Sequence, residues 1–193
     1  MRSPVSLRAA RTDDAEALVE LWESVMRKCD REEMVAEARR IVSESEDDPA
    51  SCVVVAELDG VIAGAIFLRA TTITPVNLEP VVQALHPHVA PRFQGRGVGR
   101  ALIEAAVIYA EERGIGHVAS AATAGSRDAN RFMARLALGP IATLRLAPAS
   151  AIRAKLAAHG PGGRAASPHL SQVIAARRLL RRRAAAPAVD PVA

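Results

Sequence analysis

A glycine-rich segment in the middle of the chain has residue types and spacing that suit chemistry. It reads Gln94-Gly95-Arg96-Gly97-Val98-Gly99-Arg100, and a run with helical character follows it. Alternating glycines let a backbone turn tightly and come close to a ligand. The first turn of a helix offers free N–H groups and a partial positive charge, which together suit a phosphate. We therefore predict a loop that holds a diphosphate with backbone N–H groups, while Arg96 and Arg100 add positive charge at its mouth.

Other interpretations of these glycines fit less well. A dinucleotide-binding fingerprint needs Gly-x-Gly-x-x-Gly after the first strand of a βαβ unit, whereas this spacing is Gly-x-Gly-x-Gly in mid-chain. A Walker loop needs Gly-Lys-Ser/Thr, which the segment lacks. A loop whose glycines merely permit a tight turn is the structural alternative. The helix expected directly after the glycines favours the anion site.

The elements around this loop are expected in the order β-α-α-β-β-β-α-β-α-β-β. That order predicts an α+β fold with a mixed, mostly antiparallel sheet flanked by helices. Asp59-Gly60 is a strong hairpin signal, and Pro87 predicts a bulge in or beside the strand that precedes the loop. The strands are expected at about 5–9, 52–58, 61–70, 80–90 and 115–123, with a final hairpin of 141–147 and 151–156. Helices are expected after Thr12 or Asp13 and at about 31–43, 99–113 and 126–138, an acidic turn at 43–49 and a connector at 71–77.

Charge and composition divide the chain. Residues 141–193 hold eight arginines and one lysine against Asp190, a net +8, so residues 1–140 carry −4 of the total of +4. A Gly/Pro-rich stretch at 159–168 predicts a linker, so we expect a main domain at 1–157 and a basic tail at 158–193 with a short helix at 171–183. The tail suits an acidic partner or simple solubility, and it lacks the interleaved aromatics of a strong nucleic-acid signal.

The cysteines and the absence of long apolar runs bear on the cellular compartment of the protein. Cys29 and Cys52 form no disulfide framework and no metal-ligand spacing, so we expect a reduced, cytoplasmic setting and no metal site. No signal-peptide pattern begins the chain, and no apolar run approaches the roughly 20 residues of a membrane span.

At the loop the chain resembles the GCN5-related N-acetyltransferase (GNAT) family. The family's acetyl-CoA signature reads Gln/Arg-x-x-Gly-x-Gly/Ala, which Gln94, Gly97 and Gly99 match. Val89-Ala90-Pro91 is similar to the family's strand ending Val-x-Pro, and the segment 55–64 is similar to its hairpin. The expected order of elements agrees over about residues 5–156.

The resemblance implies the acyl-CoA N-acyltransferase (GNAT) fold, in which coenzyme A enters a splay between two parallel strands. The main chain at Val89 and Ala90 would contact the pantetheine arm and the thioester oxygen. The backbone of residues 94–100 would hold the diphosphate. Asn130 lies where the family often has an asparagine that touches the cofactor, with Asp128 or Ser126 as alternatives. The implied activity is transfer of an acetyl group from acetyl-CoA to a primary amine of a small molecule or protein, by direct attack on the thioester.

The catalytic groups are less clearly marked. An alkyl amine with a pKa near about 10.4 is mostly protonated at neutral pH and needs a base, for which Glu79, His86 and His88 are candidates. His86 and His88 share a face if their strand is regular, although both can also be ordinary surface histidines. Where the family commonly has an acidic tyrosine, this chain has Arg135. Its only tyrosine, Tyr109, is expected to be structural.

That departure keeps other functions open. A non-catalytic acyl-CoA-binding or scaffolding module is the main alternative. A protein whose active part is the basic tail is another. The sequence does not identify the acceptor, and it leaves open whether the protein is a homodimer.

Overall fold

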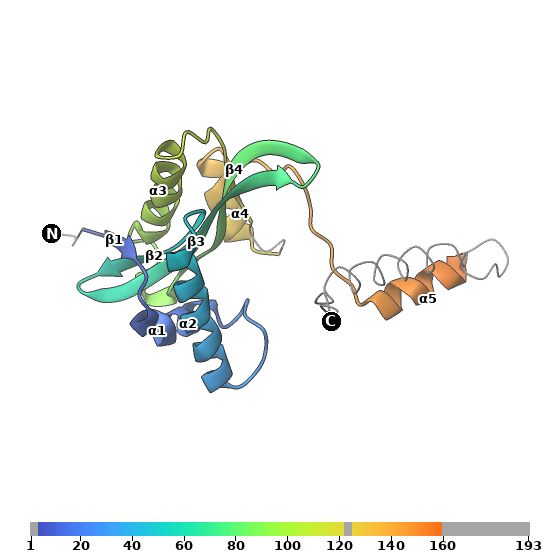
Figure 1. Cartoon of the computed structure of the whole chain (residues 1–193), viewed down its shortest axis with the longest axis horizontal. Helices are drawn as coiled ribbons and strands as arrows, with labels where there is room; N and C mark the ends of the chain where they lie inside the picture. Colours follow the sequence, from blue (N-terminus) through green and yellow to red (C-terminus); the bar gives the residue numbers. More distant parts are fainter. Residues whose placement is uncertain (1–3, 122–124, 160–193) are drawn as a thin grey trace, which may run out of the picture. The chain divides into compact units, whose positions relative to one another are not determined.

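In the computed structural model, which describes residues 4–121 and 125–159, five strands form one sheet in the order β1-β2-β3-β4-β5 (Figure 1). Neighbouring strands are antiparallel except β4 and β5, which are parallel. The predicted mixed, mostly antiparallel sheet is therefore confirmed. The strands are β1 (Ser6–Ala9), β2 (Ser51–Leu58), β3 (Val61–Thr74), β4 (Asn77–Val89) and β5 (Val118–Ser120).

Helices cover both faces of this sheet. The helices α1 and α2 pack on one face, and α3 and α4 lie on the other (Figure 1). Side chains cap two of the helices, because Asp30 accepts a hydrogen bond from the N–H of Glu33, and Ser126 accepts one from the N–H of Ala129. The helices are α1 (Ala15–Trp22), α2 (Arg31–Asp47), α3 (Val98–Glu111) and α4 (Arg127–Arg135), with short 3₁₀ turns η1 (Thr12–Asp14) and η2 (Pro91–Phe93).

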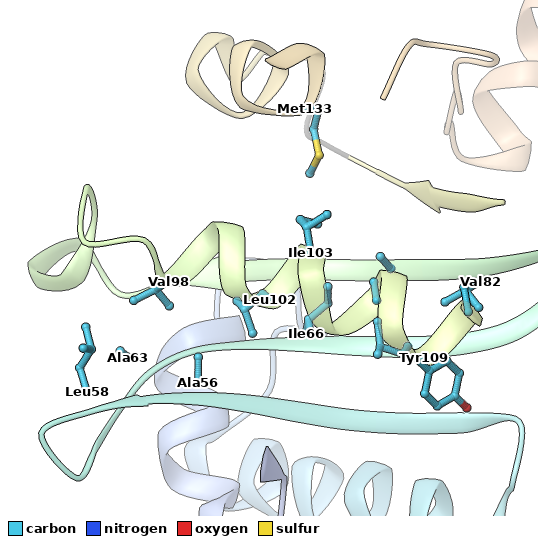
Figure 2. Close-up of a cluster of buried hydrophobic side chains, with 14 residues drawn as sticks. Ala56, Leu58, Ala63, Ile66, Val82, Val98, Leu102, Ile103, Tyr109 and Met133 are labelled. Atoms are coloured by element: carbon cyan, nitrogen blue, oxygen red, sulfur yellow. The ribbon is translucent and has the colours of Figure 1, made fainter. Parts of the chain in front are cut away.

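Two apolar cores result, one on each side of the sheet. On the α1/α2 side, Leu18, Val55 and Ala65 are among the buried members. On the α3 side, Leu102 packs among residues of β2, β3 and β4, and Met133 of α4 extends toward α3 (Figure 2). The apolar side chains of the central strands therefore alternate between two covered faces, which explains why β2 and β3 are apolar almost throughout.

The strand β4 is irregular where it approaches the glycine-rich loop. Its pairing with β3 passes from Leu85 opposite Phe67 to His88 opposite Ala65, so β4 has one extra residue at this point. His86 lies in this bulge with φ 50°, a backbone conformation that is uncommon for a residue with a Cβ. The bulge predicted from Pro87 is confirmed.

Pairing with β5 ends before this bulge. The parallel ladder joins Val82–Ala84 of β4 to Val118–Ser120 of β5, whereas β4 continues to Val89. Among the described residues, no strand pairs with β4 beyond Ala84 on that side. One edge of β4 therefore keeps unpaired backbone groups just before the loop.

Several sequence-based expectations were wrong. The final hairpin does not form, because residues 140–148 are in neither helix nor strand and Ala149–His159 is the helix α5. The acidic segment expected as a turn is the last part of α2, which continues to Asp47. The connector expected at 71–77 is mostly strand, since only Pro75 and Val76 separate β3 from β4.

Contacts divide the chain into two compact units, residues 1–139 and 140–193. The first holds the sheet and α1–α4, and α5 belongs to the second. The predicted helix at 171–183 lies outside the described residues, and the predicted domain boundary at residue 157 stays a prediction. No helix in the described part of the chain is long and apolar enough to cross a membrane.

Gly64 marks a close approach between β3, β4 and α3. A Cβ added there would lie 2.6 Å from the carbonyl oxygen of His88 and 2.9 Å from Cγ1 of Val98. We expect Gly64→Ala to lower the free energy of unfolding by about 1–3 kcal/mol, because the neighbouring backbone must move. Chemical denaturation measures this. Gly116→Ala is the matched control, since nothing lies within 4 Å of its added Cβ. Equal changes in the two variants would contradict the close packing at Gly64.

Candidate active site

The glycine-rich loop connects η2 to the first turn of α3. Gly97 is the N-cap of α3 with φ 91°, and no side chain caps the helix there. The first helical hydrogen bond runs from the N–H of Ala101 to the carbonyl of Gly97 at 3.0 Å. The N–H groups of the preceding first-turn residues have no acceptor within the helix and point along its axis. The loop therefore has the geometry of an anion site, and its φ at Gly97 favours glycine.

Two arginines flank an aromatic ring beside this loop. The guanidinium groups of Arg92 and Arg96 lie 4.9 and 5.8 Å from the centroid of Phe93. The ring face attracts both cations and holds their charge near the loop. Arg100, in the first turn of α3, is exposed.

The open edge of β4 lies directly before the loop. The N–H of Ala90 donates to the carbonyl of Ala63 at 2.9 Å, so Ala90 directs its backbone groups toward β3. Backbone groups alternate in direction along a strand, and the N–H of Val89 consequently faces the open edge. The loop, the end of β4 and α4 come close together at Gly99. A Cβ added there would lie 3.4 Å from the ring of Phe132 of α4 and 3.7 Å from Cγ2 of Val89.

The polar candidates on α4 have partners of their own. Asn130 is exposed, and its Nδ2 donates to the carbonyl of Ser126 at 2.7 Å. The hydroxyl of Ser126 caps α4 by accepting from the N–H of Ala129 at 3.3 Å. Asp128 is an exposed residue of the first turn. All three lie at the start of α4, the helix whose Phe132 faces Gly99.

His86 and His88 lie on the same face of β4, toward α1 and α2. His88 is opposite Ala65, which belongs to the core on that face, and directly paired residues direct their side chains to the same side. His86 faces the same layer, because it lines a hollow beside Trp22 of α1. Burial lowers the pKa of His88 below its usual 6.5, and the neighbouring His86 lowers it further. His88 is therefore neutral at pH 7, the protonation state that a general base needs.

Glu79 lies elsewhere on β4. It is ten residues before Val89, and its Oε1 is 3.5 Å from Nδ1 of His117 in an exposed pair. At about 3.3 Å per residue, ten residues of strand separate Glu79 from Val89 by roughly 30 Å. The structure does not bring Glu79 together with His86 and His88.

Tyr109 has the structural surroundings expected of it. It is buried in α3, and its hydroxyl is 3.4 Å from the carbonyl oxygen of Pro49. The guanidinium of Arg113 lies 3.4 Å from the ring centroid, and burial raises the pKa of the phenol. Arg135, which the resemblance places at the family's tyrosine position, is the exposed last residue of α4.

A hollow of about 290 Å³ beside β4 was not foreseen from the sequence. It is bounded by α1 and the segment after it, by α2, and by the strands β3 and β4. Beneath it, the indole N–H of Trp22 donates to the carbonyl of His86 at 3.0 Å. The lining residues are Trp22, Val25, Met26, Arg27, Glu37, Ile41, Phe67 and His86.

Within residues 4–121 and 125–159, no cluster of three or more His, Cys, Asp or Glu side chains could hold a metal ion.

Comparison with known proteins places this architecture in a family. The model of the acetyltransferase (GNAT) family matches residues 15–138. The chain belongs to the GNAT family of acetyltransferases. No curated protein matches the chain significantly.

Solved structures show the same fold at low sequence identity. A transcriptional regulator from Bacillus halodurans is 21% identical with a TM-score of 0.65, over 75% of this chain and 99% of that one. The aminoglycoside N-acetyltransferase AAC(6')-Iy in complex with CoA is 18% identical with a TM-score of 0.64, over 77% and 96%. A ribosomal-protein-alanine N-acetyltransferase from Brucella melitensis is 19% identical with a TM-score of 0.56, over 75% and 99%. The GNAT fold expected from the resemblance is confirmed.

The Trp22 hydrogen bond supports the bulge of β4. We expect Trp22→Phe to lower the free energy of unfolding by about 1–3 kcal/mol, because the partly buried carbonyl of His86 loses its donor. Circular dichroism melts measure this. Tyr109→Phe is the control, since it removes a longer, weaker hydrogen bond of 3.4 Å to a carbonyl and should cost about 0.5 kcal/mol or less. A Trp22→Phe protein as stable as wild type would show that the bulge does not need this donor.

Proposed function

We propose that this protein is an acetyl-CoA-dependent N-acetyltransferase that acts on a primary amine. The observation that carries the proposal is the uncapped start of α3 at Gly97, directly after the open edge of β4. An uncapped helix start favours a phosphate, and the unpaired strand edge can hydrogen-bond an extended amide-containing arm. Diphosphate and pantetheine are joined in this way in coenzyme A. Membership of an acetyltransferase family supports the same assignment.

Each part of the cofactor would have its own residues. The backbone of residues 94–100, namely Gln94, Gly95, Arg96, Gly97, Val98, Gly99 and Arg100, would hold the diphosphate. The main chain of Val89 and Ala90 would bind the pantetheine arm. The N–H of Val89, which faces the open edge, would donate to the thioester oxygen. Asn130, on the helix beside Gly99, would contact the cofactor from α4.

Bound acetyl-CoA would supply an electrophilic thioester carbonyl. Attack of the amine nitrogen on that carbon would break the carbon–sulfur bond, and the departing thiolate would take a proton from water, whose hydroxide the proton lost by the amine would neutralise. The proton lost by the amine goes to a base, and we propose His88 for this role because it is neutral at pH 7. His86, on the same face of β4, would be the alternative base. Glu79 is the weaker candidate, because it lies far from Val89 along β4.

One observation favours a second candidate, a non-catalytic acyl-CoA-binding module. Arg135 occupies the tyrosine position, and the only tyrosine of the chain is buried against Pro49 and Arg113. A coenzyme A thiol is acidic enough to leave without a protein acid, so the lack of this tyrosine does not exclude turnover. Thiol release with a panel of amines separates the candidates, because turnover above solvent hydrolysis excludes the non-catalytic module.

The loop prediction can be tested with two glycines at opposite ends of α3. Gly97→Val should abolish binding of acetyl-CoA measured by calorimetry, because the side chain strains a φ of 91° and displaces the N–H groups of the loop. Gly114→Val is the control, since Gly114 also has a positive φ of 64° but lies beyond the other end of the helix. Wild-type affinity in Gly97→Val would contradict the diphosphate role of the loop.

A pH profile tests the base. Neutral His88 is the active form and its pKa lies below 6.5, so the rate should fall only as the pH drops below that value. We expect His88→Gln to lower kcat about 10²- to 10⁴-fold and to remove this acidic limb. His117→Gln, a change directly before β5 and beside Glu79, should leave both kcat and the acidic limb unchanged. If the acidic limb persists in His88→Gln, another group is the base.

A further inference from the structure

We infer that the hollow between α1, α2 and β4 binds the body of the acceptor, and that this acceptor is a small primary amine carried on an apolar aryl or alkyl group. The inference deepens the proposed function, on which it rests. It concerns the class of amine rather than the transfer reaction itself.

The hollow is on the same side of the sheet as His88, the proposed base. His86 lines it, and His88 lies on the same face of β4 two residues later. Val89, whose N–H faces the open edge, follows His88 directly. A molecule in the hollow can therefore extend an amine past the two imidazoles toward the end of β4.

The walls are mainly apolar. Five of the eight lining side chains are apolar, and they come from four different segments of the fold; they are Trp22, Val25, Met26, Ile41 and Phe67. Val25 is 46% exposed, which leaves apolar surface open to solvent. An apolar ligand would remove that surface from water at about 25 cal/mol per Å².

The charged side chains of the lining satisfy each other. Nη2 and Nε of Arg27 lie 2.8 and 3.1 Å from Oε1 of Glu37, and Nη2 also lies 3.1 Å from Glu33. Glu37, the one acidic side chain of the lining, is therefore already paired with a cation. Moving an extra cation into this apolar space without a partner is unfavourable, so the lining selects against polycationic amines.

The volume limits the acceptor further. About 290 Å³ is at the lower end of the range for small-molecule sites. A single ring or a branched alkyl group fills this space, whereas most of a multi-ring polyamine would lie outside it.

Trp22 offers a direct readout of occupancy, because it is the only tryptophan of the chain and it lines the hollow. Phenethylamine, putrescine and alanyl-alanine amide are titrated against the full chain, with and without free coenzyme A, while tryptophan fluorescence is recorded. We expect a saturable change with phenethylamine and a Kd at least about tenfold lower than for putrescine or the peptide amide. Binding of putrescine or the peptide amide as tightly as phenethylamine would overturn the inference, as would no saturable response to phenethylamine.

A matched pair of variants locates the binding. Val25→Asn should weaken phenethylamine binding about five- to tenfold, because it removes apolar surface from the hollow. Val61→Asn, at a valine of similar exposure in the β2–β3 hairpin (43%), should leave it unchanged. Equal effects of the two variants would contradict this location. Melting curves exclude unfolding of either variant.

A second pair tests the charge argument. Arg27→Ala releases the carboxylate of Glu37 and should tighten putrescine binding several-fold, whereas Arg40→Ala breaks the Arg40–Glu44 pair elsewhere on α2 and should not. Unchanged putrescine affinity in Arg27→Ala would contradict the role of the ion pair.

Calorimetry with coenzyme A separates failure of the acceptor inference from failure of the proposed function. If coenzyme A binds but phenethylamine does not, the acceptor inference fails while the proposed function stands. If phenethylamine binds and coenzyme A does not, the proposed function fails and the apolar hollow remains an amine site.

Discussion

Among the described residues, the backbone of β4 beyond Ala84 has a strand partner on one side only, and this constraint organises the rest of the candidate site. An unpaired edge inside a protein must find other hydrogen-bond partners, such as a ligand or water. Here the edge continues into η2 and then into the uncapped first turn of α3, so two sets of unpaired N–H groups follow each other along the chain. In this arrangement a strand edge that can hydrogen-bond an amide adjoins a helix start that suits a phosphate.

The two faces of the sheet make different contacts near the bulge at His86. The extra residue in β4 gives His86 an uncommon φ of 50°, and the indole N–H of Trp22 donates a hydrogen bond to the carbonyl of His86. The same tryptophan forms part of the hollow, so the support of the bulge and the wall of the proposed acceptor site are one side chain. On the opposite face, Gly64 lets α3 and β4 come close to β3, which places the helix start near the end of β4.

The sequence predicted local features better than contacts between distant segments. The loop, the turn at Asp59-Gly60 and the bulge near Pro87 depend on glycine and proline, whose backbone preferences are readable directly. The expected strand at 151–156 was wrong because the segment 149–159 contains five alanines together with Arg153, Lys155 and Leu156, which favour a helix. The acidic end of α2 was mistaken for a turn because its charges lie on an exposed helix surface rather than in a loop.

The hollow could not be predicted, because its walls come from four segments whose approach no local pattern records. Trp22 and Ile41 had the spacing of ordinary core residues, and the pairing of Arg27 with Glu37 depends on how α2 packs after α1. The choice of His88 as the proposed base also depends on contacts between distant segments. The lowered pKa of His88 comes from burial and from His86, and both follow from the three-dimensional fold.

The central claim is that backbone N–H groups at the start of α3 and the end of β4 hold coenzyme A. The most direct measurement is a titration of the ¹⁵N-labelled protein with coenzyme A, followed by backbone amide shifts in nuclear magnetic resonance. The account predicts that the largest shifts fall on the amides of Val89 and of residues 95–100. Saturable shifts concentrated elsewhere, with these amides unchanged, would contradict it.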